Sequence, residues 1–454
     1  MPADEAIVEM TEYQLILVVP ESRKVLAISD ADSYRLPSAR IPQWTRPAEQ
    51  LQKRILKAWK CNAVVLEILR GSSPWAVVEI LNAGPYVGLT PIRLAQLEST
   101  QLSDDQRSQL MEMLDNQSPV PNLISRVGWI DEAIRWLESE TGAKISSKTD
   151  ILQYNAGGSF TLLRFRMKDG RDYWLKATGE PNVHEPAITR YLSGRCTEFL
   201  PAFISFKPEW NAWLMSGEAR SVADLPANPI DLFAFLNDVV ESMALVQTKI
   251  RGESLELLAA GAFDQRTHVL QAEANALFDF LEEAMAKQIS TKVPRLDAKR
   301  IKEISAIFGL VCERVALLGI DDSIVHGDIN LGNILIGVNH CQFVDWSEAY
   351  VGHPLVTLQH LLLLNKADSP QVREFIHTLL IQRYCDVWRN SCDQSLLDRG
   401  LPYMPLMAAA SALYGRGSWL TTSERNDARR QSYARSLARH MDRLIREPEL
   451  LEAL

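Results

Sequence analysis

The sequence predicts an α+β chain, and three observations support this fold class. Short apolar runs separated by turns fill residues 12–81, with one stretch of helical spacing among them. A second strand-rich stretch covers residues 145–177. From residue 231 onward, apolar residues recur mainly at helical spacing. With 454 residues, the chain is long enough for two or three domains, each with its own core.

The composition argues against several classes of function. A formal net charge of -9 and the lack of a long Lys/Arg run argue against a nucleic-acid surface. The first residues are acidic and lack a basic region followed by an apolar one, so no secretory signal is expected. The apolar run at 361–364 is too short to span a bilayer. No membrane partner is therefore expected. Six scattered cysteines without a Cys-x-x-Cys pair suit reduced thiols, so a cytoplasmic protein is expected.

Residues 1–122 are expected to form a small α/β domain. Strands are predicted at 13–19, 24–29, 34–37, 62–69 and 75–81, with a helix at 47–60. This order resembles a Nudix domain. Active Nudix hydrolases carry two glutamates on this helix, because several carboxylates must hold Mg²⁺ against a diphosphate, but Ala58 and Trp59 take those places here. The resemblance therefore implies a degenerate, catalytically inactive Nudix-like domain, and an unrelated α/β domain is the open alternative.

Two helices and a linker are predicted between this domain and the next strands. A polar helix is expected at 97–117, and the turn-rich stretch at 116–122 is the predicted linker. A second helix is expected from Ser125 to Thr141, because its apolar residues have helical spacing and Gly142 follows. The predicted domains are the Nudix-like domain at 1–122, a helical lead-in with an amino lobe at 123–220, and a helical carboxyl lobe at 221–454.

A glycine pair between two predicted strands is the first candidate for nucleotide binding. Gly157 and Gly158, followed by Ser159, can let backbone amides approach phosphates. An ordinary hairpin turn is the alternative, because the Gly-x-Gly-x-x-Gly pattern of protein kinases is missing.

A lysine inside an apolar strand is the second candidate. Lys176 lies in the run 173–177 and needs an anionic partner or a route to water. Considered together with the polar residues at 323–346, described next, Lys176 is predicted to contact the α- and β-phosphates of a nucleotide. Its expected partner is Glu185, in a helix with a proline in its first turn, and Glu198 is the second choice. An outward-pointing lysine on an edge strand is the alternative.

The residues at 323–346, here called the catalytic segment, carry the strongest functional signal. Asp328 follows an apolar pair, Asn333 comes five residues later, and Asp345 ends the next apolar run. This is the spacing of a kinase catalytic loop. A carboxylate at 328 can accept the proton of an attacking hydroxyl, while Asn333 and Asp345 offer hard oxygen ligands that suit Mg²⁺. A hairpin whose polar residues only make turn hydrogen bonds is the alternative.

The sequences His326-Gly327-Asp328 and Val344-Asp345-Trp346 resemble the aminoglycoside phosphotransferase (choline kinase-like) family. The resemblance implies a two-lobed, protein kinase-like fold that phosphorylates a small-molecule hydroxyl with a nucleoside triphosphate and Mg²⁺. It assigns Asp328 as the catalytic base, and Asn333 and Asp345 as metal ligands. Met215 and Ser216, at the end of an apolar strand, become the candidates for the hinge that binds the adenine edge.

Two positions depart from the family pattern. His353 and Thr357 stand where the family commonly has aspartates, the second of which braces the catalytic loop. The predicted function is ATP-dependent transfer of the γ-phosphate to the hydroxyl of a small molecule; GTP in place of ATP and a homodimer are left open. A catalytically weak or inactive kinase-fold scaffold is the alternative. A protein kinase is discounted, because no Ala-Pro-Glu follows Asp345.

Overall fold

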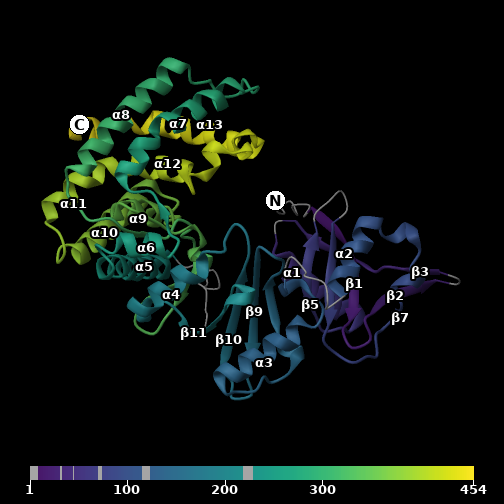
Figure 1. Cartoon of the computed structure of the whole chain (residues 1–454). Coiled ribbons are helices and arrows are strands. Elements are labelled where there is room, and N and C mark those ends of the chain that lie inside the picture. Colours follow the sequence, from purple (N-terminus) through teal and green to yellow (C-terminus); the bar gives the residue numbers. More distant parts are fainter. Residues whose placement is uncertain (1–8, 31–32, 44, 70–73, 115–122, 218–228) are drawn as a thin grey trace, which may run out of the picture. The chain divides into compact units, whose positions relative to one another are not determined.

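The computed structural model describes residues 9–454 apart from 31–32, 44, 70–73, 115–122 and 218–228. The chain forms two compact units (Figure 1). The first unit comprises Met1–Pro186 and Ala202–Glu218, and the second comprises Ala187–Pro201 and Ala219–Leu454. The linker predicted at 116–122 lies outside the described residues.

The first unit begins with a sheet that is covered by helices on both faces. Its elements are β1 (Met10–Val19), β2 (Lys24–Asp30), β3 (Ser33–Arg35), β4 (Ser38–Pro42), α1 (Pro47–Trp59), β5 (Ala63–Leu69), β6 (Trp75–Ile80), β7 (Thr90–Ile92) and α2 (Asp104–Leu114). The strand order is β3-β2-β1-β6-β5, with β4 on β1 and β7 on β2. Strand β6 is buried throughout, because one core includes Leu51 and Ile55 of α1, and another includes Leu110 of α2. This burial on both faces explains why β6 is apolar apart from Glu79.

A second, antiparallel sheet completes the first unit. It contains β8 (Leu152–Asn155), β9 (Phe160–Arg166), β10 (Asp172–Thr178), β11 (Ala202–Lys207) and β12 (Ala212–Ser216), in the order β11-β12-β10-β9-β8. Helix α3 (Trp129–Thr141) packs its apolar side chains into the same core as Phe165 and Leu175. The helix predicted from Ser125 begins at Trp129 instead, because Gly128 has a left-handed backbone, and a short 3-10 turn at Leu123–Ser125 precedes it.

Two glutamine side chains join the two sheets of the first unit. Gln153 of β8 accepts a hydrogen bond from Val65 N and donates one to Val65 O, both at 2.7 Å. Gln52 of α1 donates to Ile151 O at 2.9 Å and accepts from Gln153 N at 3.1 Å. The side-chain amide of Gln153 therefore pairs with β5 much as another strand would.

The second unit is mainly helical and encloses one large apolar core. Its helices are α4 (Glu185–Arg195, whose first two residues belong to the first unit), α5 (Pro229–Lys249), α6 (Ser254–Ala259), α7 (Thr267–Ala286), α8 (Ala298–Ala316), α9 (Pro354–Leu362), α10 (Pro370–Trp388), α11 (Gln394–Gly400), α12 (Met404–Tyr414), α13 (Ala428–Leu444) and α14 (Pro448–Ala453). Five short strands lie among them: β13 (Phe263–Asp264), β14 (Ser323–Val325), β15 (Ile334–Ile336), β16 (Cys341–Phe343) and β17 (Tyr350–Gly352). The predicted α+β class is confirmed. Within the described residues, we find no helix that is both long and apolar enough to cross a membrane.

Candidate active site

The catalytic segment folds into a strand, a loop and a hairpin. Strand β14 pairs with β17, and β15 pairs with β16 so that Ile334 lies opposite Phe343. Asn333 comes immediately before β15, and Asp345 comes two residues after β16. Val344 N donates to Asn333 O at 3.0 Å, which continues the pairing beyond the strands. The hairpin thus brings Asn333 and Asp345 to the same end.

Asp328 and Asn333 are in direct contact. The Asn333 amide donates to Asp328 O at 2.8 Å and to Asp328 Oδ2 at 3.2 Å. Asn330 also donates to Asp328 Oδ1 at 3.2 Å and accepts from Gly332 N at 2.9 Å, which fixes the turn. Because the amide nitrogen of Asn333 faces Asp328, its Oδ1 is the atom left to bind a cation. The turn hydrogen bonds of the alternative interpretation are therefore present in this loop.

Gly327 explains why this loop reads His-Gly-Asp. Its φ angle is 79°, and a Cβ atom at this position would lie 2.0 Å from Glu348 O. The 3-10 turn at Trp346–Glu348, immediately after Asp345, therefore passes too close for any side chain. The arginine that protein kinases carry at this place has no room here.

His326 connects the loop to the strand that carries Asp345. The His326 ring is buried, and its Nε2 lies 2.9 Å from Val344 O. The ring also packs against Trp346, with 4.5 Å between the ring centroids. Asp345 itself has a left-handed backbone, with a φ angle of 68°, and accepts from Ser347 Oγ at 3.1 Å. These contacts fix the backbone next to Asp328 and Asp345, the two aspartates of the catalytic segment.

The sequence analysis missed the residues that hold β14, here called the buried clamp: Gln247, Thr357 and Tyr384. Gln247 of α5 is fully buried and donates to Ile324 O at 2.7 Å and to Thr357 Oγ1 at 2.8 Å. The Tyr384 hydroxyl donates to Gln247 Oε1 and lies 2.8 Å from Pro354 O. Gln247 O also accepts from Ser323 Oγ at 2.9 Å. A glutamine on the apolar stripe of α5 was the signal available in the sequence.

The two departures from the family pattern have different surroundings. Thr357 belongs to the buried clamp and so braces β14 through Gln247. His353 is buried, and neither of its ring nitrogens has a hydrogen-bond partner among the described residues. Burial lowers the pKa of His353 to about 4, so the ring is neutral near pH 7.

In the first unit, Lys176 is paired with Glu185. Lys176 Nζ lies 2.5 Å from Glu185 Oε1, and the two residues are 5% and 1% exposed. The ammonium also lies over the Phe160 ring, 4.6 Å from its centroid. Strand β10 lies between β9 and β12, so the interpretation of Lys176 as an edge lysine is wrong. Glu198, the second choice of partner, is paired with Lys249 instead.

The glycine loop, residues 156–159, connects the antiparallel strands β8 and β9. Gly157 has a φ angle of 113°, and its carbonyl accepts from Thr161 Oγ1 at 3.0 Å. Gly158 N donates to Glu67 Oε2 at 3.2 Å. Glu67 lies in β5, far earlier in the chain, and no sequence pattern had pointed to this contact. The loop is thus a hairpin connection in its backbone geometry, with an amide directed at an anionic group.

The hinge candidates Met215 and Ser216 end strand β12. Met215 lies opposite Trp174 of β10 and Phe203 of β11, and Ser216 lies opposite Tyr173 and Ala202. Both residues are therefore inside the sheet rather than beyond it. Gly217 is the first residue after β12.

The donor atoms of the catalytic segment fit a hard cation. Asp328, Asn333 and Asp345 supply carboxylate and amide oxygens, which are the ligands that Mg²⁺ takes in kinase sites. Among the residues that the structure describes, no group of three or more His, Cys, Asp or Glu side chains could hold a metal by itself. A few protein oxygens together with nucleotide phosphates are the usual Mg²⁺ environment.

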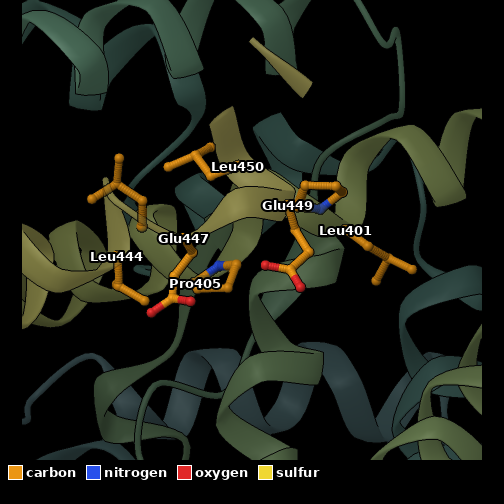
Figure 2. A pocket seen from close by; sticks show the side chains of 8 residues that line it. Leu401, Pro405, Leu444, Glu447, Glu449 and Leu450 are labelled. Atoms are coloured by element: carbon orange, nitrogen blue, oxygen red, sulfur yellow. The ribbon is translucent and has the colours of Figure 1, made fainter. Parts of the chain in front are cut away.

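A separate pocket lies near the carboxyl end of the second unit, with a volume of about 310 Å³ (Figure 2). Leucine and proline side chains form most of its wall, and Glu447 and Glu449 add two carboxylates. No residue of the catalytic segment lines it. The pocket is therefore not the site built around Asp328.

Comparison with known families identifies part of the chain as a phosphotransferase. Residues 226–390, which include the catalytic segment, match the phosphotransferase enzyme family, APH. This part of the chain belongs to that family, so the family and the enzyme class predicted from His326-Gly327-Asp328 are confirmed. No curated protein matches the chain. The Nudix-like domain stays a prediction.

Several solved structures are similar to this chain at low sequence identity. A choline/ethanolamine kinase family protein from Mesorhizobium loti is 15% identical, with a TM-score of 0.45, over 71% of this chain and 97% of that chain. A macrolide 2'-phosphotransferase from Brachybacterium faecium is 16% identical, with a TM-score of 0.42, over 68% and 96%. A choline kinase from Cryptosporidium parvum Iowa II is 12% identical, with a TM-score of 0.48, over 72% and 98%.

Proposed function

We propose that the protein transfers the γ-phosphate of ATP to a hydroxyl group of a small molecule. One observation carries the proposal: Asp328, Asn333 and Asp345 are gathered by one loop and one hairpin, inside the segment that matches the phosphotransferase family. A carboxylate beside a pair of metal-binding oxygens is the arrangement that phosphoryl transfer uses.

Each residue has a distinct role in this proposal. Asp328 accepts the proton of the attacking hydroxyl and orients it, while Asn333 and Asp345 hold Mg²⁺. When bound, the ion would neutralise negative charge on the phosphates. Lys176, held by Glu185, contacts the α- and β-phosphates, and the amides of the glycine loop contact phosphate oxygens. Backbone groups at Met215 and Ser216 bind the adenine edge. GTP is the other nucleotide to test.

The acceptor is a small molecule with a free hydroxyl, in a cytoplasmic setting. The names of similar structures suggest a first panel that contains choline, ethanolamine and a macrolide. Aminoglycosides, sugars and homoserine-like amino acids extend the panel to other hydroxyl acceptors.

A second candidate function is nucleotide binding without transfer. It is favoured by His353 and Thr357, which replace two aspartates of the family pattern. The buried clamp weakens this candidate, since Thr357 still braces β14 through Gln247.

Replacement of the proposed base tests the function. We expect Asp328→Asn to lower the turnover of ATP and acceptor by about 10² to 10⁴-fold, the usual effect of losing a general base. Binding of Mg²⁺-ATP should be retained, because the metal ligands at 333 and 345 are unchanged. The measurement is ADP release with each acceptor of the panel, with Asp321→Asn as a control in the same unit. Equal turnover in Asp328→Asn and the parent protein would contradict the role of Asp328.

A further inference from the structure

Glu67, in the amino-terminal sheet, directs its carboxylate to the glycine loop. The pairing of β5 with β6 shifts its register between Val65 and Glu67, which marks a β-bulge. A bulge commonly turns a side chain away from its regular direction. Glu67 Oε2 accepts from Gly158 N at 3.2 Å and from Ser125 Oγ at 2.7 Å. Glu67 Oε1 accepts from Ile68 N at 3.3 Å. The carboxylate is therefore held by three separate donors.

The shape of the glycine loop is matched to this carboxylate. A Cβ atom on Gly157 would lie 2.8 Å from Glu67 Oε1, so the carboxylate fills the place that a side chain would need. On its other side, the loop contacts the end of β10: a Cβ on Gly179 would lie 2.1 Å from Gly158 O, and Gly179 N donates to Ser159 O at 3.1 Å. The loop is thus fixed between β10 and a group from the amino-terminal sheet.

A carboxylate and a phosphate make the same demand on a backbone amide. Each is an anionic acceptor, and one N–H makes one strong hydrogen bond at a time. Two anions a few ångströms apart also repel each other in a partly buried site. A phosphate oxygen that approaches Gly158 N must therefore displace Glu67 or accept its repulsion.

We propose that Glu67 determines the affinity for the nucleotide, because its carboxylate competes with a phosphate for the Gly158 amide. This inference rests on the proposed function, in which the glycine loop contacts phosphates. It gives the amino-terminal domain a role in the reaction, since a residue of that domain sets how tightly the phosphates bind. Ser125, before α3, supports the competition by holding the carboxylate in place.

Binding measurements on the full-length protein separate the phosphate part of the ligand from the rest. The ligands are Mg²⁺-ATP and adenosine, which has no phosphate, and the method is isothermal titration calorimetry. Glu67→Gln keeps the shape and one acceptor but removes the charge. We expect it to tighten binding of Mg²⁺-ATP on the order of tenfold and to leave adenosine affinity unchanged. Ser125→Ala should act in the same direction with a smaller change.

Glu112→Gln is the matched control, because Glu112 is an exposed glutamate of α2 in the same unit. It should leave both affinities as they are. If Glu67→Gln leaves Mg²⁺-ATP affinity unchanged or weakens it while adenosine binds normally, the inference is overturned and the proposed function stands. If no variant binds either ligand, the proposed function fails, and the inference fails with it.

Discussion

The two loops proposed to act on the phosphates are held in different ways. In the second unit, the strand before Asp328 is held by the buried clamp, in which Gln247 is neutral and fully buried. In the first unit, the glycine loop is contacted by Glu67, a charged and half-buried residue. A neutral network inside a core is costly to open, because its groups would lose their partners. A carboxylate near solvent can be replaced by another anion. The buried clamp therefore keeps the strand before Asp328 in place. The glycine loop, in contrast, can exchange Glu67 for another anionic partner.

Removing Gln247 should have the largest effect on stability. Gln247→Leu leaves Ile324 O, Thr357 Oγ1 and the Tyr384 hydroxyl with fewer partners in the core. We expect the free energy of unfolding to fall by about 4 kcal/mol. Turnover should fall as well, because β14 leads directly to Asp328. Urea unfolding and steady-state kinetics measure the two effects.

Tyr384→Phe is the milder variant of the same clamp. It removes the hydroxyl that bonds to Gln247 and Pro354 but keeps the ring. The expected loss is about 1 to 2 kcal/mol. A loss in Gln247→Leu no larger than this would show that the clamp does not hold β14.

The first unit should lose stability as the pH rises. Glu79 of β6 is buried and accepts from Gly128 N at 2.6 Å. Burial raises the pKa of Glu79 from its ordinary value of 4.5 to about 7, although the Gly128 N–H lowers it. Between these two values the folded chain keeps a proton that the unfolded chain has lost. The free energy of unfolding should therefore fall by about 3 kcal/mol from pH 4.5 to above pH 7.

The comparison of the parent protein with Glu79→Gln measures this effect. The difference between their free energies of unfolding in urea is followed at several pH values from 5 to 8. A difference that does not change with pH would show that Glu79 titrates near its ordinary value.

The second unit should respond to pH in the opposite direction. Burial lowers the pKa of His353 from 6.5 to about 4. Between these values the unfolded chain takes up a proton that the folded chain does not. Stability from this residue is complete above pH 6.5 and is lost as the pH falls through 4, by about 3 kcal/mol in all. His353→Phe should reduce the acid sensitivity of thermal unfolding between pH 7 and pH 4, although burial also lowers the pKa of His360 to about 4. An unchanged pH profile would refute the assignment.

Much of the fold could be predicted from local patterns. Five strands of the first sheet, helix α1 and the long helices of the second unit follow from apolar spacing, whereas the short strands β4 and β7 were not predicted. The start of α3 was misplaced, because the left-handed Gly128 ends the preceding turn, and a single glycine does not reveal its φ angle. Asp328, Asn333 and Asp345 were found because they lie within one short segment.

The contacts of Glu67 and Gln247 could not be predicted in the same way. Glu67 meets Gly158 across 91 residues, and Gln247 meets Thr357 across 110. Their partners depend on how distant elements pack, which no local pattern records. A polar residue on an apolar stripe indicates burial, but it does not identify the partner.

Thermal unfolding with and without Mg²⁺-ATP, on the parent protein and on Asp345→Ala, tests the central claim most directly. A ligand that binds only the folded chain raises its stability by about 2.7 kcal/mol at a hundredfold excess over Kd. The account predicts a rise in Tm that requires Mg²⁺ in the parent protein and is lost in Asp345→Ala. A rise of equal size in Asp345→Ala, or no rise at millimolar nucleotide in the parent protein, would contradict it.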